Sequence, residues 1–352
     1  MKDVLIVGLG LAGISLCERL EAKGKTFDVY TDTSQKSSLV AGGLYNPVIL
    51  KRFTMAWRAD AQMDVAIPFY QQLQTKLGTQ LDYKVKVLRR FTSIEEQNTW
   101  FEAADKPRLA RFLNTHLHKN TNDGIDAPFG YGEVLETGRV ATEKLVQLYA
   151  KYLEGISALH RTTFLYQDLQ MLKDGVAYQG KKYEKVVFAE GFGLKSNPYF
   201  NYLPLNGTKG ELLTVKIPGL RETSVIKSSV FIIPLEEDVY RIGATYKWKD
   251  KTNTPTDAAK EELLEKLEKF LKLPYTVEKH VAGIRPTVTD RRPLVGGHPI
   301  YEQLYVLNGF GSRGVLIAPE VSNQLVDAMY GTAQLHPEID IQRFQNKYVA
   351  ST

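Results

Sequence analysis

Three glycines near the start of the chain have the residue type and the spacing needed to bind a phosphate group. Gly8, Gly10 and Gly13 form the pattern G-x-G-x-x-G directly after an apolar run at residues 4–7. Such a run is typical of a strand buried on both faces of a parallel sheet, and residues 11–23 follow as an amphipathic helix. The first glycine allows a tight turn, the second lets the backbone approach a pyrophosphate, and the third lets helix and strand pack closely. The pattern therefore predicts a dinucleotide at the helix N-terminus.

The acidic residue expected after the second strand of such a motif can be interpreted in two ways. Residues 27–31 are expected to form that strand, and Thr31 stands where a glutamate is usual. Asp32 follows directly and could bind the ribose hydroxyls of the dinucleotide. It could instead cap the turn that includes Thr33 and Ser34. We favour the ribose role, and the turn-capping role stays open.

The composition is ordinary for a globular protein, with 43% hydrophobic and 24% charged residues in a chain of 352. That length predicts two joined domains. The net charge of +5 permits an anionic ligand or RNA but requires neither. Cys17 is the single cysteine, which excludes an intramolecular disulfide, and we expect it to pack in the first helix. The longest apolar stretch is too short and too rich in glycine to span a membrane, so we expect a cytoplasmic protein.

Apolar strands that end in glycine return in the middle and near the end of the chain. Residues 186–191 read VVFAEG, and residues 304–306 lead into Asn308 and a glycine-rich turn before a helix through Met329. Between these strands lie segments that alternate in polarity, as in an antiparallel sheet with one solvated face: residues 211–216, 230–234 and 240–246. The order predicts a nucleotide-binding domain that is interrupted by insertions.

The segments that join these strands carry weaker patterns. We expect helices at residues 58–77, 95–105, 108–114, 142–153 and 257–272. We expect single strands at residues 83–91 and 131–140. The sequence has no internal repeat and no low-complexity tract.

Four stretches together resemble a known family. They are residues 8–13 (GLGLAG), 186–191 (VVFAEG), 283–296 (GIRPTVTDRRPLVG) and 309–319 (GFGSRGVLIAP). In this order and spacing they resemble the FAD-dependent amine and amino-acid oxidoreductases of the D-amino-acid oxidase superfamily, which includes glycine oxidase and sarcosine oxidase. The two C-terminal stretches are also similar to the flavin domain of the bifunctional tRNA wobble-uridine modification enzyme. The resemblance covers nearly the whole chain and is strongest at its two ends.

The resemblance implies an α/β fold with two domains. A Rossmann-like FAD-binding domain would be discontinuous, and a substrate domain with a mixed or antiparallel sheet would be inserted into it. The expected bounds of the FAD-binding domain are residues 1–80, 140–206 and 282–352. The substrate domain would then comprise residues 81–139 and 207–281.

The resemblance also implies FAD as the cofactor. No cysteine lies near the C-terminal flavin loops, so we expect the flavin to be bound non-covalently. Residues 37–44 are small and rich in glycine, which suits either close contact with a flat ligand or a plain surface loop. The expected cofactor-binding residues are Gly8, Gly10, Leu11, Ala12, Gly13, Asp32, Ala41, Gly42, Gly43, Leu44, Ala189, Gly191, Gly309, Gly311, Ser312, Arg313, Gly314 and Val315.

The chemistry implied by the family is hydride transfer from the carbon next to an amine to flavin N5, followed by hydrolysis of the imine. No metal is required. Arg285, in the G-x-R-P segment, matches the family arginine that pairs with a substrate carboxylate, for which a guanidinium is well suited. A structural salt bridge with Asp290 is the alternative. Arg313 could cover the flavin or hold the substrate, and Tyr246 could supply a hydroxyl to the site.

One position departs from the pattern of glycine oxidase-like enzymes. Phe231 stands where those enzymes often carry a tyrosine that helps bind the carboxylate, and this argues against a simple glycine-like substrate. Lys247 could assist oxygen chemistry, although a solvated lysine is the simpler interpretation. These residues leave the identity of the amine open.

The sequence therefore predicts an FAD-dependent oxidoreductase that acts on the C–N bond of a small amino acid or secondary amine. The electron acceptor would be O2 or a quinone. One alternative is a flavin enzyme that acts on a carboxymethylaminomethyl-type modified tRNA base. RNA is not favoured, because the basic residues are spread along the chain and form no stripe. The other alternative is a non-catalytic FAD-binding protein.

Overall fold

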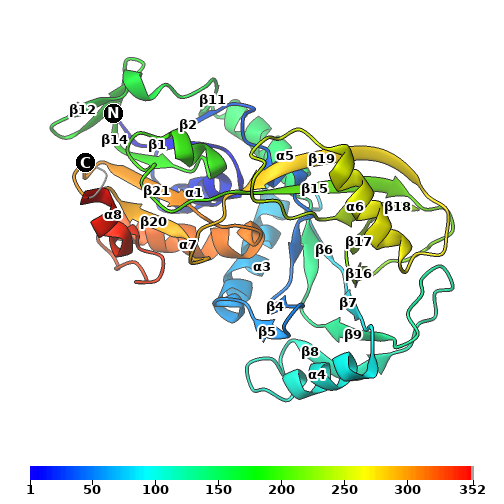
Figure 1. The fold of residues 1–352 in the computed structure, drawn as a ribbon. Helices are drawn as coiled ribbons and strands as arrows, with labels where there is room; N and C mark the ends of the chain where they lie inside the picture. Colours follow the sequence, from blue (N-terminus) through cyan, green and yellow to red (C-terminus); the bar gives the residue numbers. More distant parts are fainter. Residues whose placement is uncertain (350–352) are drawn as a thin grey trace.

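The computed structural model describes residues 1–349, and these form a mixed α/β protein with two eight-stranded sheets (Figure 1). In the first sheet, β11, β2, β1, β14 and β21 run parallel, as the apolar runs in β1, β14 and β21 predicted. A hairpin and one further strand pair antiparallel with this parallel core. The strands of the first sheet are β1 (Lys2–Val7), β2 (Phe27–Thr31), β11 (Leu159–Arg161), β12 (Gln170–Leu172), β13 (Gly175–Tyr178), β14 (Lys181–Phe188), β20 (Leu294–Gly297) and β21 (Leu304–Asn308).

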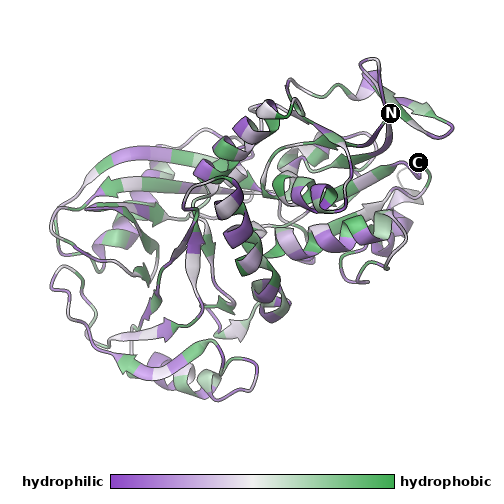
Figure 2. Ribbon diagram, turned by 180° about the vertical axis from the view of Figure 1, so that it is seen from behind, coloured by the Kyte–Doolittle hydropathy of each residue, from purple (hydrophilic) through white to green (hydrophobic). Residues whose placement is uncertain are grey.

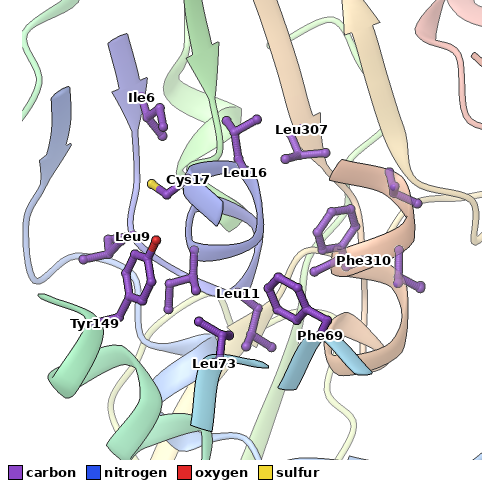
Figure 3. Packing of buried hydrophobic residues seen from close by; sticks show 14 of the residues in the cluster. Ile6, Leu9, Leu11, Leu16, Cys17, Phe69, Leu73, Tyr149, Leu307 and Phe310 are labelled. Atoms are coloured by element: carbon purple, nitrogen blue, oxygen red, sulfur yellow. The ribbon is translucent and has the colours of Figure 1, made fainter. Parts of the chain in front are cut away.

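Helices α1 (Leu11–Ala22), α3 (Ala59–Lys76), α5 (Thr142–Gly155) and α7 (Gly314–Met329) pack together against one face of the first sheet. Figure 3 shows this core, in which Leu16, Phe69 and Phe310 lie between helices and strands. Green and purple stretches alternate along the helices in Figure 2, as expected for helices with one buried side. Cys17 is fully buried in this core, which confirms its expected packing, and burial raises the pKa of its thiol.

The opposite face of the first sheet is covered by a second hydrophobic cluster. Phe164 stacks on Tyr178 with ring centroids 4.3 Å apart, and both contact Tyr30 of β2. Phe188 of β14 and Phe200 extend the cluster. Because both faces are covered, residues 4–7 of β1 are almost completely buried, and this accounts for the continuous apolar run in the sequence.

The second sheet is antiparallel except where β7 and β16 run parallel. Alternate residues point to opposite faces, so Leu213 and Val215 of β15 join the hydrophobic cluster beneath α6 (Asp257–Glu268). Leu212, the residue before Leu213, faces the other way and lines the central cavity described below. The strands are β19 (Thr276–Arg285), β15 (Thr208–Lys216), β18 (Val239–Gly243), β17 (Phe231–Glu236), β16 (Val225–Lys227), β7 (Val87–Arg90), β9 (Tyr131–Val134) and β8 (Leu113–His118), in spatial order.

Shorter elements connect the two sheets and flank them (Figure 1). Two small sheets contain β3 (Leu44–Tyr45), β10 (Gly138–Val140) and β6 (Asp82–Lys84), and β4 (Val48–Ile49) with β5 (Thr54–Met55). The remaining helices are α2 (Ser37–Val40), α4 (Ile94–Ala104), α8 (Gln345–Val349), and the 3₁₀ helices η1 (Tyr166–Asp168), η2 (Gly191–Ser196) and η3 (Ile341–Phe344). Within residues 1–349, no helix is both long enough and apolar enough to cross a bilayer.

Several expected elements differ from the structure. Residues 108–114 were expected to be helical, but they form turns that lead into β8. Residues 83–91 and 131–140 are each divided into two strands that belong to different sheets, so their polarity pattern did not reveal the break. The strand β19 was not predicted, and it crosses the expected domain boundary at residue 282. The domain bounds stay a prediction.

Candidate active site

A central cavity of about 1470 Å³ lies between the first sheet and the second sheet. Its walls include the C-terminal ends of β1, β2 and β14, the N-termini of α1 and α7, and one face of the second sheet. Ligands of open α/β sheets bind outside the carboxyl ends of the strands, which is the position found here. The volume exceeds that of typical small-ligand pockets, so the cavity has room for a dinucleotide and a second molecule.

The first end of the cavity, here called the nucleotide end, is built around Gly8. Its φ of 106° favours glycine, and a Cβ atom there would lie 2.5 Å from the carbonyl oxygen of Ala189. A Cβ on Gly13 would lie only 2.1 Å from the carbonyl oxygen of Gly8. The turn, the helix and β14 therefore meet at distances that only glycine permits.

Gly10 leaves the start of α1 open toward the cavity. It is the N-cap of α1 but has no side chain that could cap the first backbone N–H groups. Ser38 Oγ accepts a hydrogen bond of 3.1 Å from Leu11 N, and a Cβ on Gly10 would lie 2.9 Å from that oxygen. The free N–H groups and the positive end of the helix dipole make this a site for an anion such as a pyrophosphate.

Asp32 lies at the end of β2 and lines the same end of the cavity. Its carboxylate accepts hydrogen bonds from Ser34 N at 2.9 Å, Ser34 Oγ at 2.6 Å and Thr163 Oγ1 at 2.9 Å. Burial acts to raise the pKa of Asp32, but these hydrogen bonds outweigh it and lower the pKa. The turn-capping contacts expected as one interpretation are thus present, and the ribose role remains a prediction.

Glu190 is a residue of the nucleotide end that the sequence did not single out. It follows β14, and its carboxyl accepts hydrogen bonds from Asn197 Nδ2 at 2.8 Å and from the Tyr166 hydroxyl. Burial raises the pKa of Glu190 to about 7, against the lowering effect of these two hydrogen bonds. Its position inside the VVFAEG segment was the available signal, but nothing in that segment indicates the burial.

The C-terminal glycine-rich loop closes the cavity between its two ends. Asn308 donates from Nδ2 to the Gly191 carbonyl at 2.9 Å, and Gly311 N donates to the Pro286 carbonyl at 3.0 Å. Gly314 then begins α7, whose N-terminus has no side-chain cap. Arg313 Nη1 donates to the Asn46 carbonyl at 2.8 Å, and burial lowers the pKa of Arg313 to about 10. This loop thus joins β14, the segment after β19 and the residues after β3.

The opposite end of the cavity, here called the substrate end, contains Arg285 at the C-terminus of β19. Its guanidinium lies directly over Gly210, because a Cβ there would be 2.0 Å from Arg285 Nη2. Arg285 Nη1 donates to the Thr245 carbonyl at 3.2 Å, and the guanidinium carbon is 5.3 Å from the centre of the Tyr246 ring. Burial lowers the pKa of Arg285.

Arg285 does not form the salt bridge that was the alternative to a substrate role. Asp290 accepts from Arg343 Nε at 3.0 Å instead. Across residues 1–349, no carboxylate pairs with the Arg285 guanidinium. The cation therefore faces the cavity with donors that the protein leaves without an acidic partner.

Phe231 lies at the substrate end on β17, and Lys227 Nζ is 4.5 Å from the centre of its ring. Lys247 does not line the cavity but pairs with Glu262 at 2.5 Å, which agrees with a lysine on the protein surface. Gly210 and Lys227 were not predicted as site residues. No motif marks them, because their role depends on strand pairing between distant segments.

Most of the predicted site residues come together in this one cavity. Gly13 and Gly309 do not line it, because the first packs against Gly8 and the second, with φ of 82°, packs beside Val288. The predicted residues that do line the cavity are Gly8, Gly10, Leu11, Ala12, Asp32, Ala41, Gly42, Gly43, Leu44, Ala189, Gly191, Tyr246, Arg285, Gly311, Ser312, Arg313, Gly314 and Val315.

Comparison with known proteins agrees with this geometry. A family model described as FAD dependent oxidoreductase (DAO) matches residues 3–328. The chain belongs to this family. It is accordingly an FAD-dependent oxidase or dehydrogenase, and the glycine-lined nucleotide end fits the dinucleotide part of FAD.

The relatives of this DAO-family chain include proteins named glycine oxidase and proteins named MnmC. Glycine oxidase of Pseudomonas aeruginosa is 22% identical over 357 residues, which cover 94% of this chain and 95% of that protein. The tRNA 5-methylaminomethyl-2-thiouridine biosynthesis bifunctional protein MnmC of Aromatoleum aromaticum is 26% identical, covering 94% of this chain but 57% of that protein. The crystal structure of glycine oxidase from Bacillus cereus superimposes with a TM-score of 0.77 over 96% of this chain and 97% of that chain, at 21% identity.

Proposed function

We propose that this DAO-family enzyme oxidises the C–N bond of a small amino acid or secondary amine that carries a carboxylate. The observation that carries the proposal is the Arg285 guanidinium, held over Gly210 in the same cavity as the glycine-lined nucleotide end. A guanidinium binds a carboxylate through two parallel hydrogen bonds, and this fixes the orientation of the bound molecule. The amine carbon of the substrate would then take a defined position within the cavity.

The cofactor of the proposed reaction is non-covalent FAD. When bound, FAD supplies the ring nitrogen that accepts the hydride. The N–H groups at the start of α1 would hold its pyrophosphate, and Asp32 its ribose. The uncapped start of α7, at Gly314 and Val315, would stabilise negative charge on the flavin ring.

The apolar residues of the substrate end support this chemistry in a second way. Leu212, Phe231 and Ile233 line the same cavity as Arg285 and present apolar side chains to it. In such surroundings the attraction between the guanidinium and a carboxylate is stronger than in water. Arg285 would therefore position the substrate, and the apolar side chains would keep the reacting carbon away from bulk water.

A larger substrate, such as a carboxymethylaminomethyl-type modified tRNA base, is the second candidate. Tyr246 and Trp248 are 46% and 49% exposed, with ring centroids 5.2 Å apart, and Tyr246 lines the cavity. Exposed aromatic rings can stack on a nucleobase. Comparing flavin reduction by free amines with reduction by tRNA that carries the modified base, both without oxygen, separates the two candidates. Adding O2 or a quinone to the reduced enzyme then identifies the electron acceptor.

Replacement of Arg285 by lysine tests the small-substrate proposal. Arg285→Lys keeps the positive charge but loses the two-pronged geometry. One charge-assisted hydrogen bond contributes about 1.5–3 kcal/mol, so the Kd of a carboxylate inhibitor such as benzoate should rise roughly 10-fold to 100-fold. The measurement is the change of the flavin absorption spectrum on titration, with flavin content as the control. If carboxylates leave the spectrum of the unmodified enzyme unchanged, Arg285 has a structural role and an uncharged amine becomes the better candidate.

A further inference from the structure

A second cation faces the substrate end of the cavity from the same sheet as Arg285. Lys227 is the last residue of β16 and pairs with Phe231 of β17, which in turn pairs with Gly243 of β18. Residues directly opposite each other in neighbouring strands share one face of the sheet. Lys227, Phe231 and Gly243 therefore form a row across the cavity face, and all three line the cavity.

Lys227 is distinguished by its lack of partners. Among the residues that the structure describes, its ammonium has no hydrogen bond and no ion pair, and it lies 4.5 Å from the centre of the Phe231 ring. Lys209, on β15 of the same sheet, shows the opposite arrangement. Its side chain is fully buried, yet its ammonium is 2.5 Å from Asp250 and 3.4 Å from Glu211 and also donates to Thr252.

The charges that surround Lys227 have the same sign. Burial lowers the pKa of Lys227 to about 8, and two cations act in the same direction: Arg89, which pairs with Lys227 across β7 and β16, and Lys266. The acids near these two residues are already used, because Glu96 binds Arg89 and Glu262 binds Lys266. Lys227 is partly buried, and a cation withdrawn from water without a counter-ion costs free energy unless a ligand supplies the anion.

We propose that Lys227 binds a second acidic group of the substrate, opposite the carboxylate at Arg285. This inference rests on the proposed function and names its substrate class: an amine that carries two acidic groups, such as an N-carboxyalkyl amino acid or a dicarboxylic amino acid. The ring of Phe231 would lie beneath the chain that joins the two groups. A phenylalanine suits this contact better than a residue that must itself bind a carboxylate.

The sheet geometry sets the separation of the two acidic groups. The Arg285 guanidinium lies over Gly210 of β15, and the Lys227 ammonium lies beside the Phe231 ring of β17. These two strands are separated by β18. Phe231 pairs with Gly243 of β18, which pairs with Leu212 of β15, and Leu212 is two residues from Gly210. At about 4.8 Å per strand and about 3.4 Å per residue, the two cationic groups lie roughly 12 Å apart. A short monocarboxylate can contact only one of them.

A series of inhibitors tests this inference on the flavin-loaded enzyme. Straight-chain dicarboxylates from malonate to suberate are titrated against monocarboxylates of equal length, at constant ionic strength, and flavin absorption is followed. We expect one of the longer dicarboxylates to bind about 10-fold to 100-fold more tightly than its monocarboxylate, as expected for one added charge-assisted hydrogen bond. Lys227→Met should remove this advantage, so that the dicarboxylate and its monocarboxylate bind with equal affinity. The matched control is Lys51→Met, which removes an exposed lysine from the same cavity.

A second variant and a pH series separate the possible outcomes. Lys227→Arg should retain most of the tighter binding of the dicarboxylate. If substitution at this position simply unfolded the protein, Lys227→Arg would lose this binding as well. The advantage should also weaken between pH 7 and pH 9, where Lys227 loses its proton, and this trend should be absent in Lys227→Met. If monocarboxylates bind but no dicarboxylate binds more tightly, the inference is wrong and the proposed function stands. If no carboxylate perturbs the flavin, the proposed function fails first.

Discussion

The two ends of the central cavity are built in different ways. The nucleotide end consists mainly of backbone, with Gly8, Gly10 and Gly13 bringing a strand, a turn and a helix to close contact. The substrate end consists of side chains, with Arg285 and Lys227 projecting from β19 and β16 of the second sheet. The glycine turn of the first end is encoded within the first 13 residues, whereas the second end depends on strands that are far apart in the sequence.

This difference determines what each end can recognise. Backbone N–H groups and a helix N-terminus bind any phosphate in the same geometry, and they tolerate little change in the chain that supplies them. Side chains on a sheet face can change one at a time while the sheet is retained. We infer that the cofactor is fixed by the architecture of this family and that the substrate is set by a few side chains at the other end.

The largest effect is expected from a side chain at the backbone-built end. In Gly10→Val the new Cβ would meet Ser38 Oγ at 2.9 Å, and Ser38 is a small side chain that can rotate away. The protein should therefore fold, but the valine would occupy the space of the pyrophosphate, so flavin content should fall to near zero. Flavin is measured by absorption after purification, and folding by circular dichroism. Gly155→Val, at an open position of α5, is the control. Normal flavin content in Gly10→Val would place the cofactor elsewhere.

Much of the fold and much of the nucleotide end could be predicted from the sequence, because many of their elements are specified by consecutive residues. The strand at residues 4–7, the glycine turn and the start of α1 are consecutive, so local patterns specify them. The C-terminal loop and α7 were predicted on the same basis. Local patterns predict these elements, and the distant contact of Gly8 with Ala189 agrees with the local preference.

The substrate end could be predicted only in part. Arg285 was found because it lies in a motif, whereas Lys227 and Gly210 carry no local signal. Their positions follow from the strand order β19-β15-β18-β17-β16, which links residues 208–285 through long-range pairing. The helix expected at residues 108–114 was wrong for a related reason, because pairing of β8 with β9 decides the conformation after residue 112.

A smaller effect is expected from a substitution at the substrate end that leaves its charged residues unchanged. In Gly210→Ala the methyl group would lie 2.0 Å from Arg285 Nη2, so the guanidinium must move. We expect the Kd of a carboxylate inhibitor to rise about 10-fold, because one charge-assisted hydrogen bond is lost or distorted. Flavin content should stay normal. Gly297→Ala, in a strand where the new methyl group meets ordinary packing at 3.4 Å, is the matched control. Equal affinity in both variants would show that the position of Arg285 is not critical.

The smallest effect concerns Glu190, the one side chain of the nucleotide end with a pKa raised to about 7. Its ordinary pKa is 4.5, so the folded protein holds this proton more tightly than the unfolded chain does. The stabilisation is complete below pH 4.5 and is lost as the pH rises through 7, which lowers the unfolding free energy by about 1–3 kcal/mol by pH 8. The melting temperature should therefore fall by a few degrees between pH 5 and pH 8.

Glu190→Gln tests this last expectation directly. Glutamine cannot ionise and keeps an acceptor oxygen for one of the two donors, Tyr166 and Asn197. The melting temperature of the variant should therefore fall less over the same pH range. Melting curves are compared at equal flavin content, with Glu154→Gln, an exposed carboxyl of the same cavity, as the control. If the unmodified protein and Glu190→Gln change in parallel, the Glu190 carboxyl is already ionised, and the nucleotide end is electrostatically more open to water than its burial indicates.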